Sequence, residues 1–206
     1  TTSPTAVCQN ITVYLDGSGN TSITASDVDG GSTDNCSVTN LSASPTSFTC
    51  TDLGANSVTL TVTDASMNSM TCTATVTVRD TVSPVAMCQN ITVYLDGSGN
   101  ASITTSDVDG GSTDNCAVSN LSASQTSFTC ADIGSNSVTL TVTDASMNSA
   151  SCLATVTVRD TVSPVAMCQN ITVYLDGSGN ASITASDVDG GSSDNCGIGG
   201  QSSSPA

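Results

Sequence analysis

The sequence has no lysine, histidine, glutamate or tryptophan, and its only cationic side chains are Arg79 and Arg159. All 18 acidic residues are therefore aspartates, and the formal net charge is −16 at pH 7. We expect no nucleic-acid partner, because contacts with phosphates require a basic surface. Catalysis is not expected either, since no histidine can act as a general base and no lysine can form a Schiff base.

Long apolar runs and large aromatic side chains are also scarce. No apolar run approaches the roughly 20 residues that a membrane span requires, so we expect no direct membrane insertion. The whole chain contains three tyrosines and two phenylalanines. A small domain with so little aromatic mass buries a thin core and is only marginally stable without covalent reinforcement.

What the sequence does contain is a repeat of 80 residues. Residues 1–80 and 81–160 are identical at 66 of 80 positions, and residues 161–206 begin a third copy. We predict immunoglobulin-like domains at 1–80 and 81–160 and the N-terminal part of a third at 161–206. Two or three strands are expected in that third copy. We expect the rest of its sandwich to come from continuation of the native chain rather than from strands of a neighbouring chain. Tandem copies of a whole domain predict a rod or filament.

Alternation of apolar and polar residues predicts β-strands throughout each repeat. In Ser57–Asp64 and Thr71–Val78, small apolar residues alternate with polar ones, most of them threonines, and Gln9–Leu15 follows the same period of two. Asp16–Asn20 has the composition of a hairpin turn between two strands. Six or seven short strands in 80 residues predict an all-β fold, a tandem array of immunoglobulin-like β-sandwiches.

Ten cysteines recur at fixed positions, four in each complete repeat, without histidine and without a Cys-x-x-Cys pair. This pattern disfavours zinc and predicts disulfides, which indicate an extracellular location. The favoured pairs are Cys8–Cys72 with Cys36–Cys50, and correspondingly Cys88–Cys152 with Cys116–Cys130.

The first of these pairs follows from the parallel, adjacent first and last strands of such sandwiches. It requires a bulge near Gln9, because Cys8 is out of phase with the apolar face of the strand that follows. The alternative pairs Cys8 with Cys36 and Cys50 with Cys72. The favoured set leaves Cys168 and Cys196 unpaired, whereas the alternative set would join them.

Each repeat carries a loop rich in hard oxygen ligands, first at Asp27–Asn35. Calcium takes six to eight such oxygens in irregular geometry. If the strands alternate in direction, the second loop meets Asp80 at the boundary between repeats, and calcium bound there would stiffen the joint. The competing interpretation is a solvated acidic loop whose aspartates and glycines serve turns. The candidate calcium ligands are Asp27, Asp29, Asp34, Asp64, Asp80, Asp107, Asp109, Asp114, Asp144, Asp160, Asp187, Asp189 and Asp194.

The boundaries between repeats carry the tripeptides Asp80-Thr81-Val82 and Asp160-Thr161-Val162. They resemble the short O-glycosylation signal of some surface-protein-exporting bacteria. We therefore predict Thr81 and Thr161 as glycosylation sites.

Three segments carry a family resemblance: Thr81–Ile91, Gly134–Asp144 and Ser151–Val158. Together they resemble the hyalin repeat (HYR) and, more strongly, the immunoglobulin-like tandem repeats of large bacterial cell-surface adhesins. The resemblance covers both complete repeats and the fragment. It implies an extracellular array of β-sandwiches used in adhesion or filament building, with export through a C-terminal signal outside this sequence. Cys36 and Cys50 depart from the expected hyalin pattern, so its disulfides are not carried over.

The sequence therefore favours a structural and adhesive role, as a segment of an extracellular, cell-surface fibre whose partners are neighbouring repeats or copies of itself. The alternative is a glycan- or protein-binding module of a secreted multidomain protein, with Tyr14 and its copies as the tyrosines available to form a sugar platform.

Overall fold

The computed structural model describes residues 2–203. Residue 1 and residues 204–206, at the outer ends of the predicted domains 1–80 and 161–206, lie outside the described residues. By internal contacts the chain divides into two compact units. The first comprises Thr1–Met87, Gly111–Leu121 and Thr141–Ser151, and the second comprises Cys88–Gly110, Ser122–Leu140 and Cys152–Ala206. The domain boundaries at residues 80 and 160 stay a prediction.

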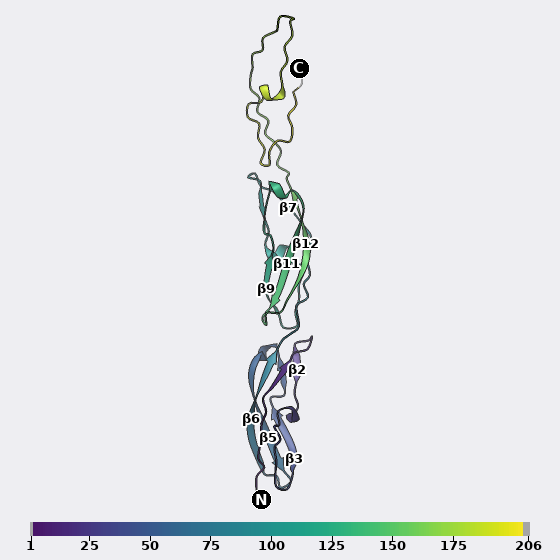
Figure 1. Ribbon diagram of the computed structural model, residues 1–206, viewed down its shortest axis with the longest axis vertical. Helices are drawn as coiled ribbons and strands as arrows, with labels where there is room; N and C mark the ends of the chain where they lie inside the picture. Colours follow the sequence, from purple (N-terminus) through teal and green to yellow (C-terminus); the bar gives the residue numbers. More distant parts are fainter. Residues whose placement is uncertain (1, 204–206) are drawn as a thin grey trace. The chain divides into compact units, whose positions relative to one another are not determined.

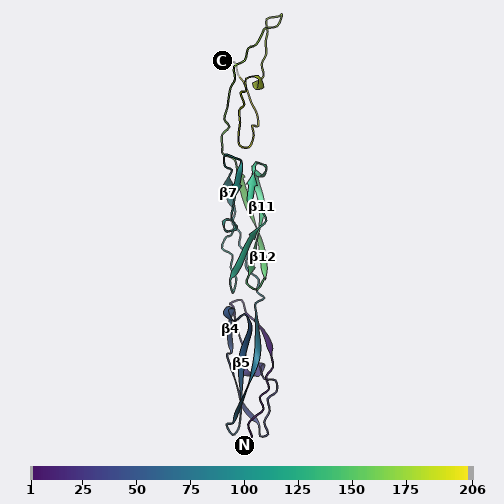
Figure 2. The same cartoon turned by 90° about the vertical axis from the view of Figure 1, so that its left-hand side faces the viewer.

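The first repeat is built of six strands arranged in two sheets. They are β1 (Ile11–Tyr14), β2 (Asn20–Ser22), β3 (Val38–Ser44), β4 (Ser47–Thr49), β5 (Gly54–Asp64) and β6 (Ser69–Arg79). One sheet has the order β1-β6-β5-β3, and the other pairs β2 with β4 (Figure 1). In the turned view of Figure 2, β4 marks the small sheet and β5 the large one. The two sheets enclose one apolar core, which confirms the predicted all-β class.

The second repeat has the same six strands in the same order. They are β7 (Ile91–Tyr94), β8 (Asn100–Ser102), β9 (Val118–Ala123), β10 (Ser127–Thr129), β11 (Gly134–Asp144) and β12 (Ser149–Arg159). The large sheet has the order β7-β12-β11-β9, and β10 pairs with β8. Sequence identity between the repeats thus extends to their strand topology.

The core consists of the apolar residues that the alternation predicts. Val58, Leu60 and Val62 on β5 are fully buried, and Phe48 from the small sheet covers them. Threonine fills the intervening positions, where a β-branched side chain suits the half-exposed surface of a pleated sheet. Phe48 is the single aromatic residue among the buried residues of this core, so small aliphatic side chains provide most of it.

The parallel pairing of the first and last strands places two cysteines together. β1 runs beside β6 in the register Ile11↔Val76, and Cys8 is bonded to Cys72 with a Cα–Cα distance of 5.8 Å. Cys8 lies outside β1, in an isolated bridge opposite Asp29, so the alternation of β1 does not set the direction of its side chain. The second repeat has the corresponding Cys88–Cys152 bond. Both pairs are those favoured from the sequence.

Short 3₁₀ turns, which the sequence analysis did not predict, recur in every repeat. In the first of them Asp27 accepts hydrogen bonds from the backbone N–H and the hydroxyl of Thr24, at 2.6 and 2.8 Å. This Thr-x-x-Asp arrangement is a capping box, in which the acidic side chain reaches back to the residue that precedes the turn. The five turns are η1 (Ala25–Asp27), η2 (Cys50–Asp52), η3 (Thr105–Asp107), η4 (Cys130–Asp132) and η5 (Ala185–Asp187).

The third copy keeps the local contacts of a repeat but, over its described residues 161–203, contains no strand. Val165 bridges Ser193 and Cys168 bridges Asp189, as their counterparts do in the complete repeats. Residues 171–174, which correspond to β1, form no ladder. Leu175 is consequently 68% exposed, whereas its counterpart Leu95 is 3% exposed. The expectation of two or three strands here was wrong.

Replacement of Leu140 by alanine should destabilise the second repeat by about 2–5 kcal/mol, since a fully buried leucine leaves a cavity that a rigid sandwich fills poorly. Leu153→Ala is the matched control, because Leu153 lies on the neighbouring strand and is 68% exposed. We expect this control to change the free energy of unfolding by no more than about 0.5 kcal/mol. Urea denaturation followed by circular dichroism measures both, and equal losses would contradict the assigned inner face of β11.

Candidate functional site

Three aspartates from distant parts of the sequence meet in the first compact unit. Asp80 follows the end of β6, Asp114 lies in the loop before β9, and Asp144 ends β11. One carboxylate oxygen from each lies within 4.8 Å of the others. We call these three residues the Asp80 cluster.

Asp80 and Asp144 are buried and Asp114 is partly buried, and the Asp80 cluster is incompletely hydrogen-bonded. Asp80 is 6% exposed and Asp144 is fully buried. Asp80 Oδ2, Asp114 Oδ1 and the amide oxygen of the adjacent Asn115 are buried without a hydrogen-bond partner. Buried polar atoms without partners are rare and costly, and three at one place form a group of oxygens that a ligand accepting electron pairs would satisfy.

Hydrogen bonds to the remaining oxygens hold each carboxylate in place. Asp80 Oδ1 accepts from the backbone N–H of Val82 at 3.0 Å and from the side-chain amide of Asn115 at 3.2 Å. Asp114 Oδ2 accepts from the backbone N–H of Cys116 at 2.9 Å. These bonds use one oxygen of Asp80 and one of Asp114, and the other oxygen of each is left without a partner.

Asp144 is fixed by the turn that follows it. Its Oδ1 accepts from the backbone N–H of Asn148 at 2.8 Å, and its Oδ2 accepts from the side-chain amide of the same residue at 2.7 Å. The Asn148 amide also donates to the backbone carbonyl of Asp80 at 3.3 Å. Asn148 therefore joins two members of the Asp80 cluster.

Electrostatic repulsion makes a cation the appropriate ligand. Two carboxylates less than 5 Å apart repel each other by roughly 3 kcal/mol or more at the effective dielectric constant of a protein surface. The chain's two arginines, Arg79 and Arg159, are both exposed. Carboxylate and amide oxygens are hard ligands that suit calcium, and none of the donors is a thiolate or an imidazole. The Asp80 cluster and Asn115 Oδ1 therefore fit calcium.

A disulfide lies directly beside the Asp80 cluster. Cys50, in η2, is bonded to Cys116, two residues after Asp114, with a Cα–Cα distance of 5.3 Å. The side-chain amide of Asn115 also donates to the backbone carbonyl of Asp16 at 3.0 Å. The bond therefore links a turn of the first repeat to the acidic loop of the second, and both ends belong to the same compact unit.

The second compact unit repeats this arrangement with residues 80 positions further along. Cys130 is bonded to Cys196, again with a Cα–Cα distance of 5.3 Å. The Asn195 amide donates to Asp160 Oδ1 at 3.1 Å and to the backbone carbonyl of Asp96 at 2.9 Å. Asp160 and Asp194 correspond to Asp80 and Asp114.

These bonds correct two predicted pairs, Cys36–Cys50 and Cys116–Cys130. The sequence analysis assumed that each repeat closes its own disulfides, but Cys36 and Cys50 lie near opposite ends of the 11-residue strand β5. Cys36 precedes Val38, which pairs with Asp64 at one end of β5, whereas Cys50 precedes Gly54 at the other end. That strand is roughly 35 Å long, and a disulfide requires Cα atoms within about 7 Å. Cys196 is bonded to Cys130, whereas Cys168 is free. The two cysteines are therefore neither both unpaired, as the favoured set required, nor bonded to each other, as the alternative set required.

Several predicted calcium ligands accept hydrogen bonds within local turns, and their role as ligands stays a prediction. Asp107 and Asp187 cap 3₁₀ turns, as Asp27 does, by accepting hydrogen bonds from the threonine three residues earlier. Asp29 and Asp189 accept the backbone N–H of the serine three residues later. Asp109 lies in a β-bridge opposite Cys88. The hydrogen bonds at these positions agree with the interpretation that the loop aspartates stabilise turns. The calcium hypothesis is therefore argued from the Asp80 cluster.

Sequence reasoning missed Asn115 as a functional residue. Its amide nitrogen donates to Asp80 and Asp16, while its oxygen is one of the unpartnered buried atoms. The available signal was the tripeptide Asp-Asn-Cys, which recurs at residues 34–36, 114–116 and 194–196. In the second and third copies it presents a carboxylate, an amide and a bonded sulfur to the preceding repeat.

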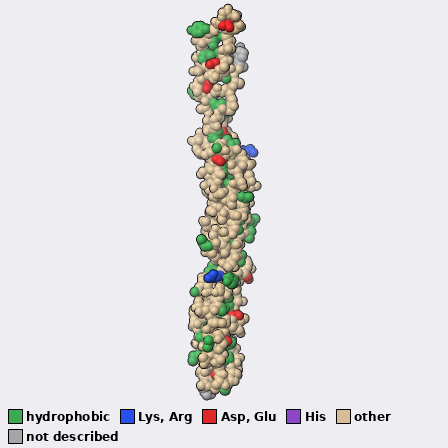
Figure 3. Space-filling view, in the orientation of Figure 1, with side chains coloured by type: hydrophobic (Ala, Val, Ile, Leu, Met, Phe, Trp, Pro, Cys, Tyr) green, Lys and Arg blue, Asp and Glu red, His purple; other side chains and the backbone are tan. Residues whose placement is uncertain are grey.

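The remaining surface carries exposed aspartates, two exposed arginines and exposed tyrosines. On the face drawn in Figure 3, basic side chains form two small, separate patches, and acidic side chains form further scattered patches. Tyr14 and Tyr94 are 57% and 58% exposed. Thr81 and Thr161, the predicted glycosylation sites, are exposed. Within residues 2–203 no helix has the length and apolar character that crossing a membrane requires.

Comparisons with known proteins give structural matches alone. No protein-family model matches the chain, and no curated protein matches it. Protocadherin gamma B7 extracellular cadherin domains 1–4 match at 10% identity with a TM-score of 0.38, covering 82% of this chain and 54% of that chain. Protocadherin gamma C5 EC1–3 matches at 12% identity with a TM-score of 0.39, covering 75% and 68%.

An endo-fucoidan hydrolase from glycoside hydrolase family 107 matches at 17% identity with a TM-score of 0.27, covering 77% of this chain and 29% of that chain. The chain spans about half the length of the first of these structures. At these identities and TM-scores, the similarities support no argument about family or function.

Acidification should destabilise the protein, because hydrogen bonds to ionised aspartates lower their pKa values. Backbone and hydroxyl donors of Thr104 hold the pKa of Asp107 below its ordinary 3.8, and the hydroxyl and backbone N–H of Ser192 lower the pKa of Asp189 to about 2. A lowered pKa in the folded state stabilises the fold above the ordinary pKa, and this contribution is lost as the pH falls through the lowered value. We expect a melting temperature that is nearly constant from about pH 7 to 5 and decreases below about pH 4, measured without calcium. A melting temperature that rises on acidification would contradict this assignment.

Two free thiols per chain are expected when the unreduced protein is denatured and titrated with Ellman's reagent. Eight of the ten cysteines form the four disulfides, and the remaining two are Cys36 and Cys168, both exposed. Alkylation before digestion should label these two cysteines alone. A labelled Cys50 or Cys116 would show that the bond beside the Asp80 cluster does not form.

Proposed function

We propose that this chain is a structural and adhesive segment of an extracellular fibre, in which β-sandwich repeats are fastened to one another by disulfides. The observation that carries the proposal is the bond from Cys50 of the first repeat to Cys116 of the second. The peptide chain already connects these repeats, so a second covalent link adds no connectivity. What it adds is resistance to separation under tension.

The composition and the cysteine pattern agree with this role. Disulfides form and persist in oxidising surroundings, so four of them favour a location outside the cell. A surface with two arginines and no lysine or histidine has few groups for acid–base or covalent catalysis, which favours a non-catalytic role. In this proposal the partners are neighbouring repeats or copies of the chain, at the cell surface.

Calcium is the proposed reinforcement of the joint. Asp80, Asp114, Asp144 and the Asn115 amide oxygen would hold it, and the bound ion would neutralise the clustered carboxylates. Because Asp80 and Asp114 come from consecutive repeats, separating the repeats would require breaking calcium ligation as well as the disulfide. The three unpartnered oxygens described above support this proposal.

Single-molecule pulling tests the mechanical role. The four disulfides interleave, so the shortest covalent path through the oxidised chain is roughly 200 Å, whereas the reduced chain stretches to roughly 700 Å. We expect the oxidised protein to stop extending at the shorter length and the reduced protein to reach the longer one. An oxidised molecule that extends to roughly 270 Å, the path left when only Cys8–Cys72 and Cys88–Cys152 are closed, would refute a structural role for Cys130–Cys196. The Cys50–Cys116 bond is tested in the double variant Cys8→Ser/Cys72→Ser, which should stop at roughly 260 Å; extension to roughly 410 Å would refute that bond.

Calcium binding is tested by a pair of substitutions that disturb equivalent turns. Asp144→Asn and Asp64→Asn each remove a carboxylate that accepts an asparagine side-chain amide at 2.7 Å, but Asp144 alone belongs to the Asp80 cluster. Calcium should raise the melting temperature of the wild type and of Asp64→Asn by several degrees and leave that of Asp144→Asn nearly unchanged. Differential scanning calorimetry with calcium or with EGTA measures the shift, and an unaltered calcium effect in Asp144→Asn would refute the site.

A further inference from the structure

The Asp-Asn-Cys tripeptide occurs three times, and two of the three copies are joined to a preceding repeat. Cys116 is bonded to Cys50 and Cys196 to Cys130, with the same sequence separation of 66 residues. Each bonded copy also places its asparagine amide against a carboxylate of the preceding repeat, Asn115 on Asp80 and Asn195 on Asp160. The loop therefore has one repeated binding mode.

The first copy, at Asp34–Cys36, has the same internal structure without a partner repeat. Asp34 Oδ2 accepts from the backbone N–H of Cys36 at 2.8 Å, as Asp114 Oδ2 does from Cys116. Asp34 Oδ1 is buried without a hydrogen-bond partner, like Asp114 Oδ1. Cys36 is exposed and forms no disulfide. The first copy therefore has the local hydrogen bonding of the bonded copies, but Asp34 Oδ1 has no hydrogen-bond partner and the Cys36 thiol has no disulfide partner.

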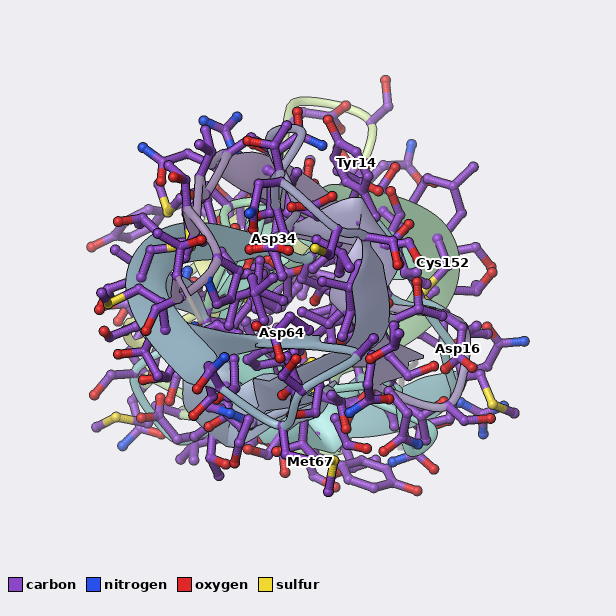
Figure 4. All side chains as sticks on the ribbon, turned by 90° about the horizontal axis from the view of Figure 1, so that it is seen from below. Tyr14, Asp16, Asp34, Asp64, Met67 and Cys152 are labelled. Atoms are coloured by element: carbon purple, nitrogen blue, oxygen red, sulfur yellow. A yellow bond between two sulfur atoms is a disulfide. The ribbon has the colours of Figure 1, made fainter. Side chains whose placement is uncertain are left out.

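A second carboxylate completes this end of the first repeat. Asp64 corresponds to Asp144, is 3% exposed, and is held by the backbone and side-chain amides of Asn68 just as Asp144 is held by Asn148. Val38, two residues after Cys36, pairs with Asp64 across β3 and β5. Figure 4 shows the side chains from below, with Asp34, Asp64 and Met67 labelled.

We propose that this end of the first repeat, made of Asp34, Asn35, Cys36 and Asp64, is an acceptor for the C-terminal end of another repeat of the same sequence. The occupant must bring a thiol equivalent to Cys50, a carboxylate equivalent to Asp80, and a carbonyl equivalent to that of Asp16. These are the groups that the second copy contacts. The interface is closed by a disulfide to Cys36, so assembly at this end is covalent.

The bond forms by oxidation of two thiols. Each thiol loses a proton, a sulfur–sulfur bond forms, and two electrons pass to a disulfide oxidant such as oxidised glutathione, which is reduced to two thiols. The reaction requires no other group on the protein. This inference deepens the proposed function by naming the partner and the bond, and it rests on that function because it assumes that repeats are fastened end to end.

The test extends the full chain by one repeat. A copy of residues 81–160 is placed before Thr1, which reproduces the natural junction in which an aspartate precedes the first threonine. The protein is oxidised in a mixture of oxidised and reduced glutathione, alkylated, digested without reduction and mapped by mass spectrometry. The Cys50–Cys116 bond in the same map serves as an internal control for native pairing.

We expect Cys36 to be bonded to the added copy's counterpart of Cys130, and its alkylation to fall at least tenfold relative to the unextended chain. Replacement of that added cysteine by serine should restore full alkylation of Cys36, and Cys36→Ser should leave the added cysteine as a free thiol. A Cys36 that stays alkylated in the extended chain, or that bonds to a different cysteine, overturns the proposal.

Calcium stoichiometry separates this proposal from the proposed function. The extension supplies a counterpart of Asp80 beside Asp34 and Asp64, so the number of bound calcium ions should increase by one in isothermal titration calorimetry. If Cys36 forms the new disulfide but no additional calcium ion binds, the proposal of an acceptor end is supported and the calcium component of the proposed function is refuted. An intact Asp80 cluster that binds calcium while Cys36 remains free would refute the acceptor end alone.

Discussion

The bond between Cys50 and Cys116 is the constraint on which the candidate site depends. Cys116 directly follows Asp114 and Asn115, so fixing its sulfur beside the η2 turn brings a carboxylate and an amide to the exit of the first repeat. Asn115 then hydrogen-bonds to Asp80 and Asp16, and Asn148 adds a contact to the carbonyl of Asp80. A thin aliphatic core offers little apolar surface for joining repeats, and covalent and polar contacts provide that link here.

Aspartate has two distinct uses in this protein, and they are distinguished by what happens to the second carboxylate oxygen. In the capping turns, one oxygen of Asp27 accepts both donors of Thr24 and the residue lies at the surface, where water solvates the other oxygen. In the Asp80 cluster, hydrogen bonds hold one oxygen of Asp80 and one of Asp114, and burial removes the other from water. The first use defines a turn, whereas the second concentrates negative charge where a cation relieves it.

The strands and one class of disulfide could be predicted from the sequence, whereas the pairing between repeats could not. Alternation identified the inner face of β5, and the parallel arrangement of first and last strands led to Cys8–Cys72. The spacing of the cysteines along the sequence does not distinguish a bond between repeats from a bond within one. Cys50 and Cys116, in different repeats, are 66 residues apart, and Cys8 and Cys72, in the same repeat, are 64 residues apart. The Thr-x-x-Asp turns were missed for a related reason, since an aspartate-rich loop has the same composition whether its carboxylates cap turns or bind an ion.

The interleaving of the four disulfides has a consequence for damage to the polypeptide. The bonds connect residues 8 with 72, 50 with 116, 88 with 152, and 130 with 196, so every peptide bond between Cys8 and Cys196 lies inside at least one closed loop. A protease that hydrolyses any single one of these peptide bonds leaves two fragments that are still joined through sulfur. Such a molecule keeps its continuity after a cut that would divide an ordinary chain.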